Sequence, residues 1–150
     1  MNFWNKFRMV YYTIIAIFFI VNLWPVRNID PAITPFHNEI FSIIEKHCDR
    51  SQYYYPLQVE IKIQPLDKVF IAYCNRNLYT KFTIVYNSKH WSYQSDDQKF
   101  ETLAHELLHC MFREDHVNDP GHFMFAYENN LSKVIVLKQL NDYLTKKCGK

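Results

Sequence analysis

Two histidines four positions apart, His105 and His109, flank a glutamate in the run His105-Glu106-Leu107-Leu108-His109. In an α-helix, residues four apart lie on one face, about one turn along the axis. The two imidazoles can therefore bind one zinc ion at the roughly 2.0–2.1 Å typical of zinc–nitrogen bonds. Glu106 lies beside this face, where it can act as a general base toward water at the metal. The pattern predicts a zinc site with hydrolytic chemistry.

A catalytic zinc ion needs a third protein ligand and keeps its fourth position open. His116, seven residues after His109, is the predicted third ligand, because a helix ending near Phe112 lets the chain turn back over the metal. Two alternatives stay open. Glu128, nineteen residues after His109, could supply a carboxylate, and His122 lies in the turn that follows His116.

The run 100–124 resembles the zinc-binding segment of zincin metallopeptidases, and its order of H-E-x-x-H, a third His and a Met is similar to that of the metzincins. The chain departs from the metzincin pattern twice. Phe112 replaces the helix-ending glycine, and Asp115 occupies the expected place of the third histidine, which follows as His116.

A closer similarity is to small bacterial metallopeptidases that read H-E-L-G-H-C, then Arg, His and Met. It covers roughly residues 69–126. The corresponding residues after the two motif histidines are Cys110, Arg113, His116 and Met124, with Leu108 in place of the glycine. The resemblance implies a zinc-dependent metallopeptidase, a hydrolase with a protein or peptide substrate.

The resemblance also assigns roles around the metal. Met124 would pack beneath it as a Met-turn. The substrate would lie extended along an edge strand above the zinc-binding helix, here the strand around Lys81–Tyr86. Independently of the resemblance, Tyr127, three residues after Met124, could reach the open side of the metal and stabilise the developing oxyanion, as a second catalytic residue beside Glu106.

A rival interpretation is a membrane-tethered module that binds zinc without catalysis. It would be supported by a closed site in which Asp115 joins the three histidines as a fourth ligand. Otherwise Asp115 or Asp119 could orient a ligand histidine by hydrogen bonding. Glu106 favours the enzyme, because a structural site needs no base at that position. A coincidental motif would bind no metal.

Residues 1–26 differ in character from the rest. Lys6 and Arg8 precede residues 9–24, an uncharged run whose length falls between a signal-peptide core and a membrane-spanning helix. With positive charge in front and no A-x-A cleavage site behind, we expect a signal anchor that contacts the membrane through residues 9–24, or alternatively a cleaved signal peptide. The zincin-like domain, 27–150, would then be extracytoplasmic, or secreted after cleavage.

The composition fits one exported domain. A net charge of only +2 gives no broad electrostatic footprint, so no nucleic-acid partner is expected. Four cysteines in an oxidising compartment favour two disulfides, for which three connectivities exist. Cys110 points toward the packed side of its helix, and Cys74 would lie on a strand beneath that helix. We therefore favour Cys74–Cys110 and Cys48–Cys148.

Periodicity predicts an α+β fold with a three-stranded sheet packed on the H-E-x-x-H helix and a C-terminal helix, preceded by an N-terminal hydrophobic helix. The resemblance implies that this fold is a small zincin-like domain. Leu57–Ile63 and Lys81–Tyr86 alternate as strands, and the apolar run Val69–Cys74 is typical of an interior strand. Residues 25–35 form a connector. Helices are predicted over 37–48, from a capping box at Ser95 to Phe112, and over 131–146.

Two helices have predicted buried faces. The motif helix would bury Phe100, Leu103, Ala104, Leu107 and Met111, next to the face that carries the histidines. The C-terminal helix offers Val134, Ile135, Leu137, Leu140 and Leu144 to the core.

Overall fold

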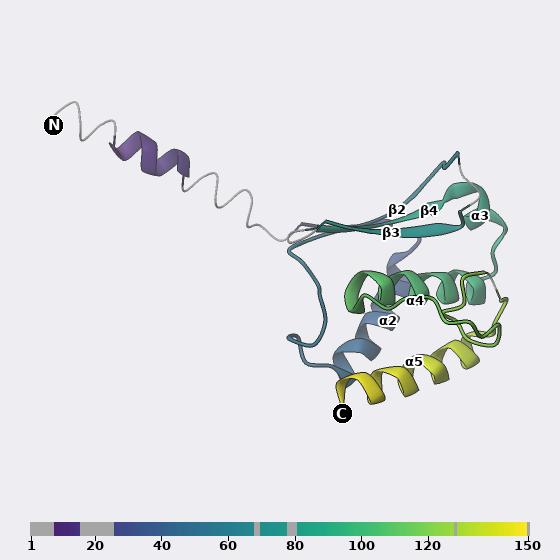
Figure 1. Ribbon diagram of the computed structural model, residues 1–150. Helices are drawn as coiled ribbons and strands as arrows, with labels where there is room; N and C mark the ends of the chain where they lie inside the picture. Colours follow the sequence, from purple (N-terminus) through teal and green to yellow (C-terminus); the bar gives the residue numbers. More distant parts are fainter. Residues whose placement is uncertain (1–7, 16–25, 68–69, 78–80, 128, 150) are drawn as a thin grey trace.

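The computed structural model describes residues 8–15, 26–67, 70–77, 81–127 and 129–149 (Figure 1). The strands are β1 (Val26–Ile29), β2 (Gln58–Gln64), β3 (Ala72–Arg76) and β4 (Lys81–Asn87). The helices of the same region are α2 (Thr34–His47), α3 (Ser88–Tyr93), α4 (Asp96–Phe112) and α5 (Lys133–Cys148). The strands form one sheet, α4 packs beneath it, and α5 lies on the far side of α4, which gives an α+β fold (Figure 1).

The sheet has four strands in the order β1-β2-β4-β3, one more than the sequence predicted. β1, β2 and β4 are parallel, and β3 is antiparallel to β4. β1 falls in the predicted connector, because its four residues, Val-Arg-Asn-Ile, show no alternation of polar and apolar side chains. Its pairing is with β2, which follows only after the crossover helix α2.

Interior and edge strands are exchanged relative to the prediction. The strand around Lys81–Tyr86, expected at an edge, is β4, which pairs with β2 on one side and β3 on the other. The apolar run Val69–Cys74, expected inside the sheet, contributes to β3 at the edge. β3 is therefore one of the two edge strands of the sheet, with β1 at the opposite edge.

The core fills the space between the sheet and α4 and continues beyond α4 to α2 and α5. The inward-facing residues of β2 and β4 are all but completely buried: Val59, Ile61, Phe82, Ile84 and Tyr86. The predicted buried stripe of α4 is confirmed at every position: Phe100, Leu103, Ala104, Leu107 and Met111. One face of α4 is thus fixed against the sheet by apolar packing, and this burial sets the rotation of the helix about its axis.

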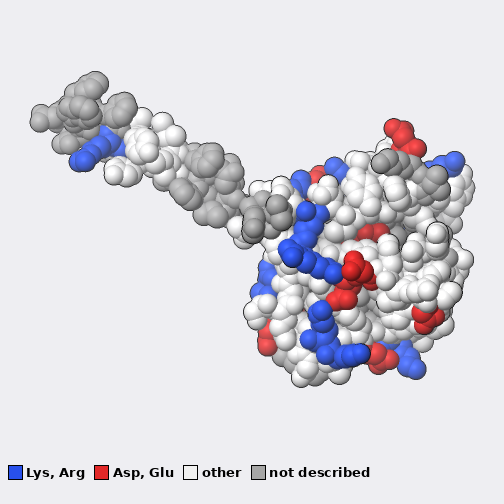
Figure 2. All heavy atoms as spheres, viewed as in Figure 1, with Lys and Arg blue, Asp and Glu red and all other residues white. Residues whose placement is uncertain are grey.

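The outer face of the sheet is polar. Glu60 on β2 lies 2.8 Å from the ammonium nitrogen of Lys81 and 3.3 Å from that of Lys62. The hydrogen bond from Lys81 is the main reason why the pKa of Glu60 lies below its ordinary value. On the face seen in Figure 2, basic side chains lie beside acidic ones, and large areas carry no charge.

Both predicted disulfides are present. Cys48–Cys148 joins the end of α2 to the last residue of α5, and Cys74–Cys110 joins β3 to α4. The pairing was predictable because Cys110 faces the packed side of its helix, with β3 above it. Two disulfides are consistent with an extracellular or secreted protein.

We expect the Cys48→Ser/Cys148→Ser double variant to lower the free energy of unfolding by about 2–5 kcal/mol. The two cysteines are 100 residues apart, so the bond removes much of the loop entropy of the unfolded chain. Chemical denaturation of the variant and the wild type, both without reductant, measures the effect. Fully reduced wild-type protein, in which both disulfides are broken, is a further comparison. An unchanged midpoint and slope would contradict this contribution.

The predicted membrane anchor is contradicted. No helix among the described residues is long and apolar enough to cross a membrane. Among these residues, 8–15 form a helix. Residues 16–24 of the predicted signal anchor lie outside the described residues. The predicted transmembrane helix and membrane-tethered location are therefore withdrawn.

Candidate metal centre

The ends of α4 are defined by local signals that also position the histidines. The helix starts with the predicted capping box, in which Ser95 Oγ accepts from the Gln98 N–H and Gln98 Oε1 accepts from the Ser95 N–H. It ends at Phe112 without glycine, because Arg113 adopts the left-handed conformation, with φ 58°. This reversal brings the chain that follows back alongside α4.

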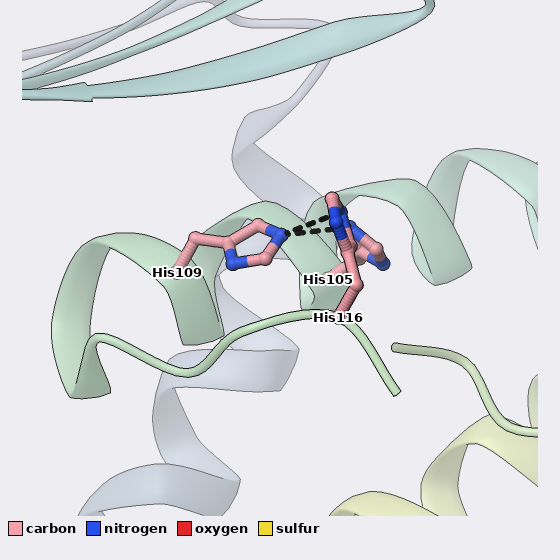
Figure 3. A group of neighbouring side chains, drawn as sticks. All are labelled: His105, His109 and His116. Carbon is pink, nitrogen blue, oxygen red and sulfur yellow. Dashed lines mark hydrogen bonds between the residues drawn. The ribbon is translucent and has the colours of Figure 1, made fainter. Parts of the chain in front are cut away.

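The reversal brings three imidazoles together, two from α4 and one from the returning segment (Figure 3). The Nε2 atom of His105 lies 2.9 Å from that of His109 and 3.1 Å from that of His116. The remaining pair, His109 and His116, is separated by 3.2 Å. The three predicted ligand nitrogens therefore converge on one point. Around a tetrahedral zinc ion, ligand nitrogens lie about 3.3–3.4 Å apart, close to these separations.

Hydrogen bonds on the far side of two rings identify which nitrogen carries the proton. His105 Nδ1 lies 2.8 Å from the carbonyl oxygen of Phe123, and His109 Nδ1 lies 2.5 Å from that of Glu114. A carbonyl only accepts, so each Nδ1 is the protonated nitrogen, and in a neutral ring Nε2 then carries a lone pair. Two lone pairs 2.9 Å apart repel each other unless a cation lies between them. The donor set therefore fits a metal ion, and imidazole nitrogen suits zinc.

The environment keeps the ligands neutral. Burial lowers the pKa of His105 to about 4, although its hydrogen bond to the Phe123 carbonyl acts in the opposite direction. Burial also lowers the pKa of His109. Neutral imidazole is the form that binds metals, so these two rings do not have to lose a proton at pH 7 before binding.

Glu106 is 7% exposed and lies on the side of α4 that faces β3. Burial raises the pKa of its carboxyl group to about 7, and a hydrogen bond with the Cys74 backbone partly offsets this rise. A carboxyl group with a pKa near neutrality can both accept and release a proton at physiological pH. Glu106 is not among the three converging histidines.

A cavity of about 940 Å³ opens between β3, α4 and the segment 123–127. Glu106 and the three histidines form part of its wall. Most of the remaining wall is apolar, with aromatic rings from Phe70, Tyr73, Phe123, Phe125 and Tyr127. Tyr127 is 75% exposed, and its ring contacts that of Phe125. A site of this size accommodates several residues of a peptide.

Of the two alternative ligands, His122 is not brought to the three histidines. His122 accepts a hydrogen bond from the Met124 N–H through Nδ1, 3.0 Å away, and its ring stacks on Phe123. Glu128 lies outside the described residues. Among the His, Cys, Asp and Glu residues that the structure describes, no fourth residue joins the group, and this includes Asp115. The closed four-ligand site with Asp115 is therefore not what the geometry favours.

Backbone carbonyls, and not the predicted aspartates, orient the rings of His105 and His109. Asp119 instead accepts a hydrogen bond from Gly121 N–H, within the turn after His116. Met124 is buried, and its carbonyl accepts from Val117 N–H at 3.0 Å, which ties the residue after His116 to the chain beyond the turn. No side-chain pattern could have identified the two carbonyls, because every residue carries one.

No protein-family model matches this chain, and neither the curated proteins nor the solved structures contain a significant match to it. The similarity to zincins therefore stays a prediction from the motif residues. The function is therefore inferred from the chemistry and geometry of the three histidines, Glu106 and the cavity.

Proposed function

We propose that this protein is a zinc-dependent metallopeptidase of the zincin type, with His105, His109 and His116 as metal ligands and Glu106 as general base. The observation that carries the proposal is the meeting of three Nε2 atoms within 3.2 Å of one another on the wall of a large cavity. A buried carboxylate, one residue from the first ligand, lines the same wall. This combination is what metal-assisted hydrolysis of a peptide requires.

Zinc bound by three imidazoles would polarise the scissile carbonyl and lower the pKa of a water toward about 7. Glu106 accepts the proton of the attacking water and later delivers it to the leaving amine. Its burial supports both steps, because a pKa near 7 balances uptake and release. The phenol of Tyr127 donates a hydrogen bond to the developing oxyanion, a role supported by its exposed position on the cavity wall.

The substrate is an extended protein or peptide segment that pairs with β3. This strand is at the edge of the sheet, and residues 70–74 line the cavity together with the metal ligands. An edge strand offers unpaired backbone donors and acceptors at regular spacing, which bind a peptide without regard to its side chains. The aromatic wall favours apolar substrate side chains beside the scissile bond.

Metal analysis combined with a peptide-library digest tests the proposal. Purified protein should contain about one zinc ion per chain, as expected for a single site with three protein ligands. It should cleave library peptides, lose this activity after treatment with a chelator and regain it when zinc is restored. Absence of stoichiometric metal, or cleavage that persists in metal-free protein, would overturn the proposal.

A further inference from the structure

Three polar residues on α5 follow one another at intervals of four: Gln139, Tyr143 and Lys147. Residues at this spacing share one face of a helix. This α5 polar stripe adjoins the apolar stripe of Val136, Leu140 and Leu144, which is fully buried in the core. The packing of the apolar stripe therefore also fixes the direction in which the polar stripe points.

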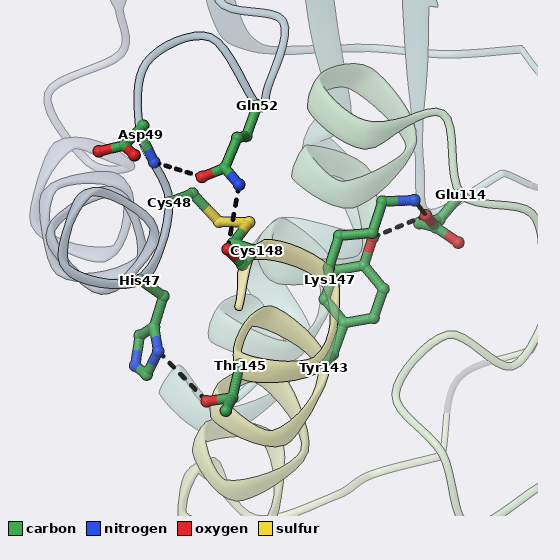
Figure 4. The surroundings of a disulfide bond; sticks show 9 residues. All are labelled: His47, Cys48, Asp49, Gln52, Glu114, Tyr143, Thr145, Lys147 and Cys148. Carbon is green, nitrogen blue, oxygen red and sulfur yellow. Dashed lines mark hydrogen bonds and ion pairs between the residues drawn. A yellow bond between two sulfur atoms is a disulfide. The ribbon is translucent and has the colours of Figure 1, made fainter. Parts of the chain in front are cut away.

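The C-terminal part of the α5 polar stripe, Tyr143 and Lys147, contacts Glu114, the hydrogen-bond partner of His109. Tyr143 Oη and Lys147 Nζ each lie 2.7 Å from the same carboxylate oxygen of Glu114 (Figure 4). The carbonyl of Glu114 accepts the Nδ1 proton of His109. Two donors from α5 thus fix the residue whose backbone orients one metal ligand.

The N-terminal part of the α5 polar stripe, Gln139, contacts Phe123, the hydrogen-bond partner of His105. The side-chain oxygen of Gln139 accepts from the N–H of Phe123 at 2.9 Å, and its amide nitrogen donates to the carbonyl of Gly121 at 2.7 Å. The carbonyl of Phe123 is the acceptor for His105 Nδ1. One amide side chain therefore fixes the turn that orients the second ligand from α4.

We propose that α5 is a positioning element of the metal centre, which acts on His105 and His109 through two backbone carbonyls without touching the metal. The inference rests on the proposed metal site. The Cys48–Cys148 bond holds the end of α5 next to Lys147 and so keeps the α5 polar stripe in place (Figure 4). Because a ligand histidine binds metal best when its second nitrogen is held by an acceptor, loosening these carbonyls weakens binding.

The test compares zinc affinity among variants of the full chain, by competition with a chromophoric chelator. Tyr143→Phe/Lys147→Met removes both donors to Glu114, and Gln139→Leu releases the turn at Phe123. We expect each variant to raise the Kd for zinc by about 10-fold, at the lower end of the effect of groups that orient ligands directly. Each measurement is made where the metal-free variant is fully folded, as established by its own melting curve.

Lys146→Met is the matched control, because Lys146 is exposed and lies one residue outside the stripe. It should bind zinc like the wild type, and Lys147→Arg, which keeps a donor for Glu114, should stay close to the wild type. If the stripe variants lower the melting temperature of the metal-free protein but leave the Kd unchanged, α5 is structural only and the inference fails. If wild-type protein binds no zinc, the proposed function fails together with the inference.

Discussion

Glu106→Gln is expected to abolish peptide hydrolysis while leaving the zinc content unchanged. Glutamine has the same shape as glutamate, and its amide oxygen can still accept the hydrogen bond from the Cys74 backbone, but it cannot take up a proton from water. Loss of a general base costs about 10²–10⁴-fold in rate. Zinc should remain, because Glu106 is not one of the three converging ligands. Turnover of a peptide found in the library digest measures the first effect, and elemental analysis the second.

Asp115→Asn is the matched control for this experiment. It makes the same change from carboxylate to amide beside another ligand, His116, but at an exposed position outside the histidine group. We expect it to keep both zinc and activity. Hydrolysis by Glu106→Gln at the wild-type rate would refute the role of base. Loss of zinc from that variant alone would instead show that Glu106 is needed to hold the metal.

The positions of the three histidines could be predicted from the sequence where its signals are local. The capping box at Ser95 and the apolar stripe of α4 fixed the start and the rotation of one helix, and that rotation determines where His105 and His109 point. The position of His116 beside α4 was predictable, because it follows His109 by only seven residues and the chain must reverse tightly within them. A left-handed residue without glycine, Arg113, makes that reversal, and its conformation has no signature in the sequence.

Sheet order could not be predicted, because it depends on contacts between distant segments. The apolar run 69–74 indicated an interior strand, yet its residues from Phe70 onward line the cavity, from the edge strand β3 and the two residues before it. On α5, Val134 and Ile135 were expected in the core but are exposed, because Val136, Leu140 and Leu144 define the buried stripe. The expected and the observed buried residues both fit helical spacing. Only the packing of α5 against α4 and α2 decides which of them are buried.

The second large effect is expected from substitution of His116, the proposed third ligand. His116→Ala should lose bound zinc on dialysis, because two imidazoles alone cannot fill three positions around the ion. His116 is exposed and comes from an irregular segment, so the metal-free variant should melt at about the same temperature as metal-free wild type. Added zinc should raise the melting temperature of the wild type and not that of the variant, since a ligand stabilises only the state that binds it.

His122→Ala and Glu128→Ala separate this assignment from its alternatives. His122 is held by the Met124 N–H and the Phe123 ring, away from the converging Nε2 atoms, so its removal should leave zinc in place. Glu128 should be equally dispensable, because the three histidines already provide the protein ligands that a catalytic zinc ion needs. The decisive readout is zinc per chain in the three variants after the same dialysis. Zinc retained by His116→Ala but lost from either of the others would move the third ligand there, and the proposed geometry of the open coordination position would have to be abandoned with it.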